Sequence, residues 1–161
     1  MTLTHDYTAR AAVITGGARG IGKGICEVFC KAGATVALWD VLDEGTQTAD
    51  QIEKDGGSIF FQKVDITNKS SVEEAVSKII SAHGKIDILI NNAGVIRDRS
   101  FMKMSEEEWN TVININLTGM FIVTKAVFPI MKEAGYGRII SASSINAFPV
   151  SYTHLTLPTK A

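Results

Sequence analysis

The sequence predicts an α/β protein built on a doubly wound parallel sheet. Apolar stretches of strand length alternate with helix-compatible stretches of ten or more residues. A glycine-rich turn, TGGARGIG, joins the first such pair at residues 15–22. The strand expected at 86–90 is apolar at every position except Asp87, as in a strand buried on both faces. Units of this kind connect by right-handed crossovers into one parallel sheet.

The elements follow from apolar periodicity and from start and stop signals. Two overlapping S-x-x-E pairs within 70–74 and a third from Ser105 to Glu108 predict capping boxes at helix starts. The last box opens a long helix, apolar at a 3.6 period from Trp109 to Met131. Pro129 is expected to loosen its final turns. The expected strands are 11–15, 35–39, 59–64, 86–90 and 138–143, and the earlier helices are about 20–32, 43–54 and 70–83.

Composition narrows the function classes. The 161 residues are 45% apolar and 20% charged with net charge −1, which is typical of one globular domain and gives no reason to expect nucleic acid or an anionic membrane as partner. No apolar run approaches the ~20 residues that span a bilayer, and the N-terminus lacks a signal core. Cys26 and Cys30 are interpreted as reduced core thiols, with no metal site. We therefore expect a cytoplasmic protein.

The glycine-rich turn predicts an anion site. Glycines at 16, 20 and 22 allow a sharp turn, close approach of backbone to a phosphate and close packing of helix on strand. The free N–H groups and positive dipole end of the following helix stabilise an anion there. A purely structural turn remains the alternative.

Asp40 bears on the choice of ligand. It ends the second strand, about 20 residues past the glycine turn, where a carboxylate accepts hydrogen bonds from an adenosine ribose and repels a 2′-phosphate. This favours NAD. NADP stays possible because the Arg19 guanidinium could meet a phosphate, and a merely solvated Asp40 is the alternative.

Taken together, the motifs resemble those of the short-chain dehydrogenase/reductase family over about residues 8–150. They are TGGARGIG at 15–22, Asp40, VDI at 64–66, NNAG at 91–94, ININLTG at 113–119 and GRIISASS at 137–144. Within the family, residues 91–109 resemble β-ketoacyl-(acyl carrier protein) and acetoacetyl-CoA reductases. The resemblance implies an incomplete NAD(P)-binding Rossmann domain over 1–150. It also implies hydride transfer between nicotinamide and a small-molecule carbonyl or alcohol, and a parent homotetramer or homodimer.

The resemblance also implies residue roles. Asn92, Ala93 and Gly94 would line the nicotinamide half, in the crevice expected where the strand order reverses, although an ordinary strand-end turn is the alternative. Ser144 would polarise the substrate carbonyl. Asn116 would support a relay water, unless it is a satisfied core amide or Asn114 fills that role. The remaining cofactor contacts would be Gly16, Gly17, Ala18, Arg19, Gly20, Ile21 and Gly22 at the pyrophosphate, Asp40 at the ribose, and Asp65 and Ile66 at adenine.

The pattern departs from the family at its end. The resemblance implies a Tyr-x-x-x-Lys general acid near position 157, where this sequence has Leu157, and Tyr152 is followed by Thr156. Residues 151–161 resemble the translated adapter tail of a gene fragment. We expect the native sequence to end near Val150 or Ser151, leaving an inactive fragment truncated after the fifth strand. A non-catalytic dinucleotide-binding module is the alternative; the TGGARGIG and NNAG forms argue against an epimerase relative.

Overall fold

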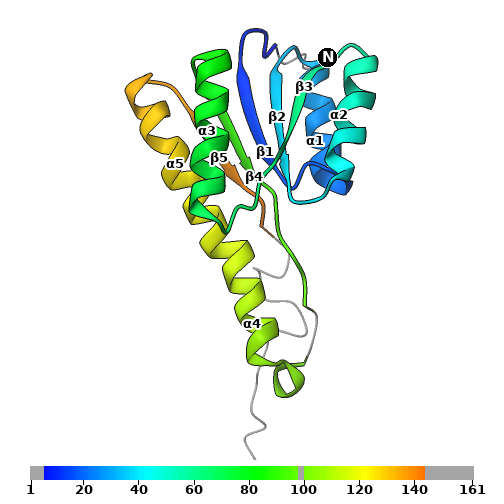
Figure 1. The fold of residues 1–161 in the computed structure, drawn as a ribbon, viewed down its shortest axis with the longest axis vertical. Helices are drawn as coiled ribbons and strands as arrows, with labels where there is room; N and C mark the ends of the chain where they lie inside the picture. Colours follow the sequence, from blue (N-terminus) through cyan, green and yellow to red (C-terminus); the bar gives the residue numbers. More distant parts are fainter. Residues whose placement is uncertain (1–5, 98–99, 144–161) are drawn as a thin grey trace, which may run out of the picture.

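Five parallel strands form one sheet in the order β3-β2-β1-β4-β5 in the computed structural model, which describes residues 6–97 and 100–143 (Figure 1). The expected strands and their parallel arrangement are confirmed, with ends shifted by one or two residues. The strands are β1 Ala11–Thr15, β2 Thr35–Asp40, β3 Ser58–Lys63, β4 Ile88–Asn91 and β5 Arg138–Ser141.

Helices cover both faces of this sheet, which makes the fold doubly wound (Figure 1). On one face lie α1, Gly20–Lys31, and α2, Glu44–Lys54. On the other lie α3, Lys69–His83, and α5, Met120–Glu133. Between β4 and α5 come a short 3-10 turn, η1 Phe101–Lys103, then α4 Glu106–Ile113 and a π-helical segment, η2 Asn114–Gly119.

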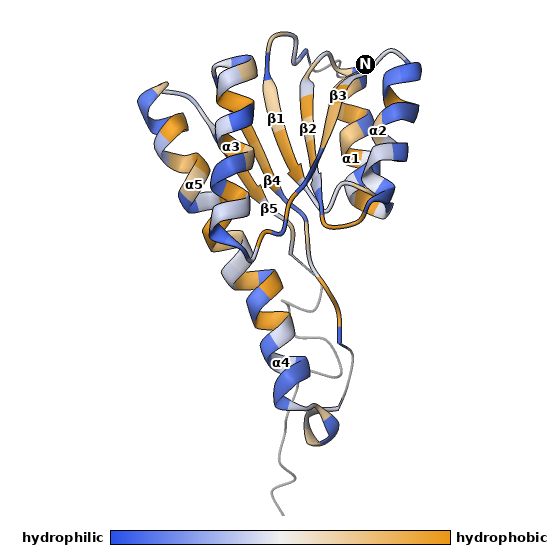
Figure 2. Cartoon of the chain, viewed as in Figure 1, coloured by the Kyte–Doolittle hydropathy of each residue, from blue (hydrophilic) through white to orange (hydrophobic). Residues whose placement is uncertain are grey.

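Successive residues of a central strand belong to opposite cores. Val13 of β1 packs with the α3 and α5 residues, whereas Ala12 and Ile14 pack with those of α1 and α2. Because both faces of the central strands β2, β1 and β4 are buried, these strands are apolar along most of their length (Figure 2). Cys26 and Cys30 are free and buried in the α1 core, as expected, and burial raises their pKa values to about 12 and about 11.

The helix caps agree with the sequence in one case and differ in another. Ser105 and Glu108 form the expected reciprocal capping box of α4. The boxes expected within residues 70–74 are not used. Instead the Asn68 side chain accepts from the N–H of Ser71, and the Ser71 hydroxyl accepts from the N–H of Asp65. An earlier amide acceptor thus starts α3 at Lys69 and frees a serine to fix the loop after β3.

The long helix departs most from expectation. Trp109 is 53% exposed, and α4 contains no buried residue because it projects beyond the sheet (Figure 1). The α-helix continues through Pro129, and the local widening lies earlier, in η2. By length and composition, residues Glu106–Glu133 would suffice to cross a membrane. Val123 and Val127 on this helix are fully buried against the sheet, although only 17% of its most apolar stretch is buried in all.

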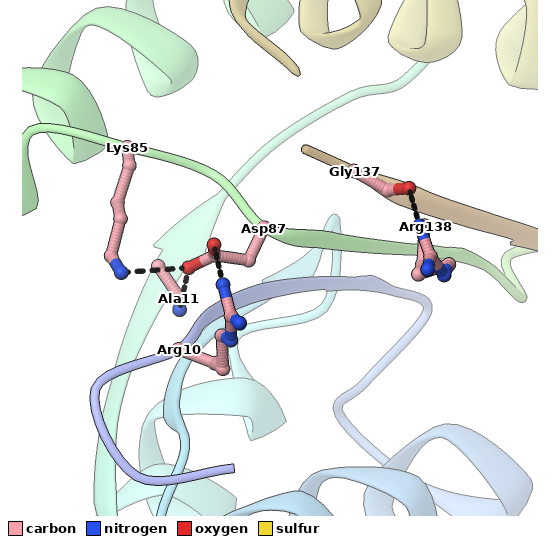
Figure 3. Close-up of polar contacts among 6 residues, drawn as sticks. All are labelled: Arg10, Ala11, Lys85, Asp87, Gly137 and Arg138. Carbon is pink, nitrogen blue, oxygen red and sulfur yellow. Dashed lines mark hydrogen bonds and ion pairs between the residues drawn. The ribbon is translucent and has the colours of Figure 1, made fainter. Parts of the chain in front are cut away.

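One buried carboxylate joins the amino ends of the strands (Figure 3). Asp87, just before β4, accepts from the N–H of Ala11 at 2.9 Å and from the Arg10 guanidinium at 2.8 Å, and it pairs with Lys85 at 3.2 Å. Burial acts to raise the pKa of Asp87. The bonds from Ala11, Arg10 and Lys85 outweigh it and hold that pKa below its ordinary value. The Arg10 guanidinium also lies 4.0 Å from the centre of the Tyr136 ring, just before β5.

Asp87→Asn should therefore destabilise the fold by roughly 2–3 kcal/mol at neutral pH, because the buried N–H and cations lose a charged acceptor. A carboxylate whose pKa is lowered by folding stabilises the folded state at pH values above its unfolded pKa of about 3.9. This stabilisation is lost as the pH falls through the folded-state pKa. The difference between the two proteins should therefore narrow below about pH 4. Urea unfolding at a series of pH values measures the difference in unfolding free energy, with Asp55→Asn, at an exposed position, as the control. Equal stabilities at neutral pH would contradict the prediction.

Candidate functional site

The glycine turn between β1 and α1 is shaped by close backbone contacts. Gly16 has φ +67°, and a Cβ there would lie 2.8 Å from the Cα of Ala93 on the loop after β4. A Cβ at Gly22, in the first turn of α1, would overlap the carbonyl oxygen of Gly16. Glycine is therefore required at Gly16 for its backbone conformation and for the close approach of the loop after β4, and at Gly22 for the packing of α1 on the turn.

Strand β2 holds the turn from one side. The N–H groups of Gly16 and Gly17 donate to the carbonyl of Trp39 at 2.8 and 3.2 Å. The N–H of Ala18 donates to Asp40 Oδ2 at 3.0 Å. The other oxygen of that carboxylate accepts from the N–H of Leu42 at 3.1 Å. These bonds satisfy the N–H groups of the turn, whereas the first N–H groups of α1 have no acceptor within the helix and are available to an external anion.

Strand β4 holds the turn from the other side. The Thr15 hydroxyl accepts from the N–H groups of Asn92 and Ala93, each at 3.0 Å. In return the Asn92 amide donates to the carbonyls of Thr15 and Gly16 at 3.0 and 3.1 Å. The corner after β1 and the corner after β4 are thus locked together.

A cavity of about 420 Å³ opens at the carboxyl ends of the strands, where these two corners meet. This is the point where the order of the sheet reverses, the usual binding crevice of doubly wound sheets. Most of the residues expected to contact cofactor line it: Gly16, Arg19, Ile21, Gly22, Asp40, Asp65, Ile66, Asn92, Ala93 and Gly94.

Three expected contact residues do not line the cavity. Gly17 and Ala18 are buried behind the turn, and Gly20 lies exposed at the start of α1. Sequence reasoning also missed several lining residues, among them Val41, Leu42, Thr67 and Val95. Val41 and Leu42 follow Asp40 directly, but only the structure shows that their apolar side chains are exposed at the cavity, so no local pattern identified them.

The carboxylates and the guanidinium of the cavity differ in their surroundings. Asp65 is exposed, and its Oδ1 accepts from the N–H and the hydroxyl of Thr67 at 2.9 and 2.7 Å. Asp40 is half-buried and bound to the glycine turn. Among the described residues, the Arg19 side chain makes no hydrogen bond or ion pair. It is therefore available to a ligand.

Asn116 lies in the π-helical segment and clamps the loop after β4. Its Oδ1 accepts from the N–H of Val95 at 2.8 Å, and its Nδ2 donates to the carbonyl of Val95 at 2.9 Å. Asn116 is exposed, so it is not the core amide that the sequence left open as an alternative, and Asn114 does not share these two bonds. Its proposed catalytic role stays a prediction.

Ser144 lies outside the described residues. The chain leading to it is held by Asn91, whose Nδ2 donates to Thr124 of α5 at 3.0 Å and to Ser141 of β5 at 3.4 Å. The carbonyl of Asn91 also accepts from the N–H of Ala142 at 2.8 Å. Asn91 Oδ1 is buried without a partner in the described part of the chain.

Comparison with known proteins matches this geometry to one family. The sequence profile described as short chain dehydrogenase covers residues 10–156. This chain belongs to the short-chain dehydrogenase family. The crystal structure of gox2181 superposes with TM-score 0.87 at 31% identity, over 90% of this chain and 57% of that one.

Two curated relatives carry functional names. A 3-oxoacyl-[acyl-carrier-protein] reductase FabG of Chlamydia muridarum is 41% identical over 138 residues, which are 84% of this chain and 56% of that protein. Oxidoreductase UcpA of Salmonella typhimurium is 43% identical over 138 residues, 86% of this chain and 52% of that protein. This chain therefore spans about half the length of these two curated relatives.

Two glycines of α1 provide a matched test of the turn. Gly22→Ala should destabilise the protein by about 1–3 kcal/mol, because the new methyl overlaps the Gly16 carbonyl. Gly24 lies two residues further along α1, and a Cβ there meets nothing within 4 Å, so Gly24→Ala should stabilise the protein by up to about 1 kcal/mol through helix propensity. Thermal unfolding compares them. Equal shifts would mean that the close contact at Gly22 does not exist.

Proposed function

We propose that this chain is the nucleotide-binding part of an NAD(P)-dependent oxidoreductase acting on a small carbonyl or secondary alcohol. The observation that carries the proposal is the cavity at the reversal point, lined by the glycine turn and by Asp40, which is hydrogen-bonded to that turn. A Cβ at Gly16 would crowd the backbone of Ala93, and one at Gly22 would overlap the Gly16 carbonyl, so the glycines let the loop after β4 and α1 pack closely around a turn that suits a pyrophosphate. The family and the names of the relatives support the same class of reaction.

Different residues of the chain would bind different parts of the nucleotide. The α1 N-terminus, with Arg19, would bind the pyrophosphate, and Asp40 would accept from the adenosine ribose. Asp65 and Ile66 would flank adenine. The loop 92–94, kept in place by Thr15 and Asn116, would orient the nicotinamide half. When bound, the nicotinamide supplies or accepts the hydride.

For substrate, we propose a 3-oxoacyl thioester, on the sequence similarity to FabG proteins. Ser144 would hold and polarise the substrate carbonyl. The sequence has no tyrosine followed four positions later by lysine. We propose that the chain is part of a longer enzyme, that residues 151–161 are foreign to it, and that the chain alone is inactive. A non-catalytic dinucleotide-binding module is the second candidate, and the same absence of a tyrosine followed four positions later by lysine favours it.

We also propose self-association and a cytoplasmic setting. Large apolar side chains are exposed along α4, η2 and α5, which favours burial against a further copy in the complete protein. They are Trp109, Leu117, Phe121 and Phe128. The two buried free thiols of α1 suit a reducing compartment.

Asp40 should make the site prefer NADH to NADPH. In Asp40→Asn, one oxygen remains to accept from Ala18 while the negative charge is lost, so the preference for NADH should fall roughly tenfold. Binding is measured by fluorescence of Trp39, which lines the cavity, in a Trp109→Phe background that removes the other tryptophan. Asp50→Asn, an exposed carboxylate on α2, is the control. An unchanged ratio would refute the role of the Asp40 charge.

Catalysis is tested by continuing the chain with the genomic coding sequence beyond Val150. The extended protein should oxidise NADH or NADPH in the presence of acetoacetyl-CoA. The 161-residue chain should bind nucleotide but turn over at least about 10²-fold more slowly, because it lacks a general acid. Nucleotide binding without turnover by the extended protein, on this and simpler ketones, would favour the non-catalytic module. Absence of nucleotide binding by both proteins would refute the proposed function.

A further inference from the structure

A buried hydroxyl outside the cavity touches the glycine turn. Thr48 lies on α2 and is 5% exposed. Its Oγ1 donates to the carbonyl of Ala18 at 2.6 Å, across thirty residues of sequence. A threonine inside a helix usually bonds the carbonyl four residues earlier in the same helix or faces solvent. Thr48 instead reaches another element.

The approach of α2 to the turn is itself tight. Gly45, one turn before Thr48, faces the ring of Phe61 on β3, and a Cβ at this glycine would overlap that ring. The α2 helix therefore lies close against the sheet, and Ala49 and Ile52 bury its apolar side. This packing brings the Thr48 hydroxyl within reach of Ala18.

The acceptor of this bond belongs to the peptide that joins Ala18 and Arg19. All peptides of the described chain are trans, so the carbonyl and the N–H of this unit point in opposite directions. With the Ala18 carbonyl turned toward α2, the Arg19 N–H is turned away from α2. Within the described residues that N–H has no hydrogen-bond partner, and Arg19 lines the cavity.

We propose that Thr48 is a positioning residue of the nucleotide site, acting through the Ala18–Arg19 peptide on the phosphate groups of the ligand. The Thr48 bond fixes the peptide plane and polarises it, so the Arg19 N–H is presented as an additional donor beside the N-terminus of α1. The inference rests on the proposed nucleotide-binding function. It assigns phosphate affinity to a side chain that does not line the cavity.

The effect should depend on phosphate. In Thr48→Val, which keeps the shape and removes the donor, the affinity for ADP should fall about fivefold to tenfold. The affinity for adenosine, which has no phosphate, should stay within about twofold. Thr48→Ser should restore ADP binding, and Thr46→Val, exposed on the same helix, should change neither.

Competition against NADH measures the affinities of ADP and adenosine at a temperature well below the unfolding transition. Trp39 fluorescence in the Trp109→Phe background reports the displacement of NADH. Should Thr48→Val fail to fold, Thr48→Ala also lacks the hydroxyl and is measured instead. Equal weakening of ADP and adenosine would overturn the inference, because it would mean a general loosening of the site. So would ADP binding unchanged in the variant. If the unsubstituted chain binds neither NADH nor ADP, the proposed function fails first, and the inference with it.

Discussion

The site depends on the lock between the ends of β1 and β4. Regular pairing of these strands extends to Ile14 and Ile90, and the chain then leaves β1 and β4 toward opposite faces of the sheet. Past that point no ladder can hold the two corners together. The Thr15 hydroxyl continues the connection, donating to the carbonyl of Ile90 and accepting from the N–H groups of Asn92 and Ala93. Asn92 returns two bonds to the turn.

This lock is matched on the other side by β2. The carbonyl of Trp39 and the carboxylate of Asp40 take the amides of the turn, so the backbone of residues 16–18 is hydrogen-bonded without a ligand. A loop whose own amides are satisfied loses little conformational entropy on binding. The donors left over are those at the start of α1, where a helix end favours negative charge.

The side of the cavity formed by the long helix is held by different contacts. Asn116 occupies both the N–H and the carbonyl of Val95, and it does so from a π-helical turn, a feature often found at functional sites. In the same segment Gly119 lies against Ile66, where a Cβ would be 2.7 Å from Cδ1. The widened turn therefore joins the helix to two loops of the cavity, and Ile115 becomes part of its lining.

The sequence alone determined the strands, their parallel arrangement in one sheet, the glycine turn and most of the cavity lining. These depend on local patterns: apolar runs, glycines at fixed positions and polar residues at strand ends. Only tertiary structure decided that Trp109 is exposed, that Val41, Leu42 and Val95 reach the cavity, and that Thr48 meets Ala18. Each of these depends on a contact, or on the lack of a contact, between segments far apart in the chain. No local pattern specifies it, because it depends on how closely whole helices pack on the sheet.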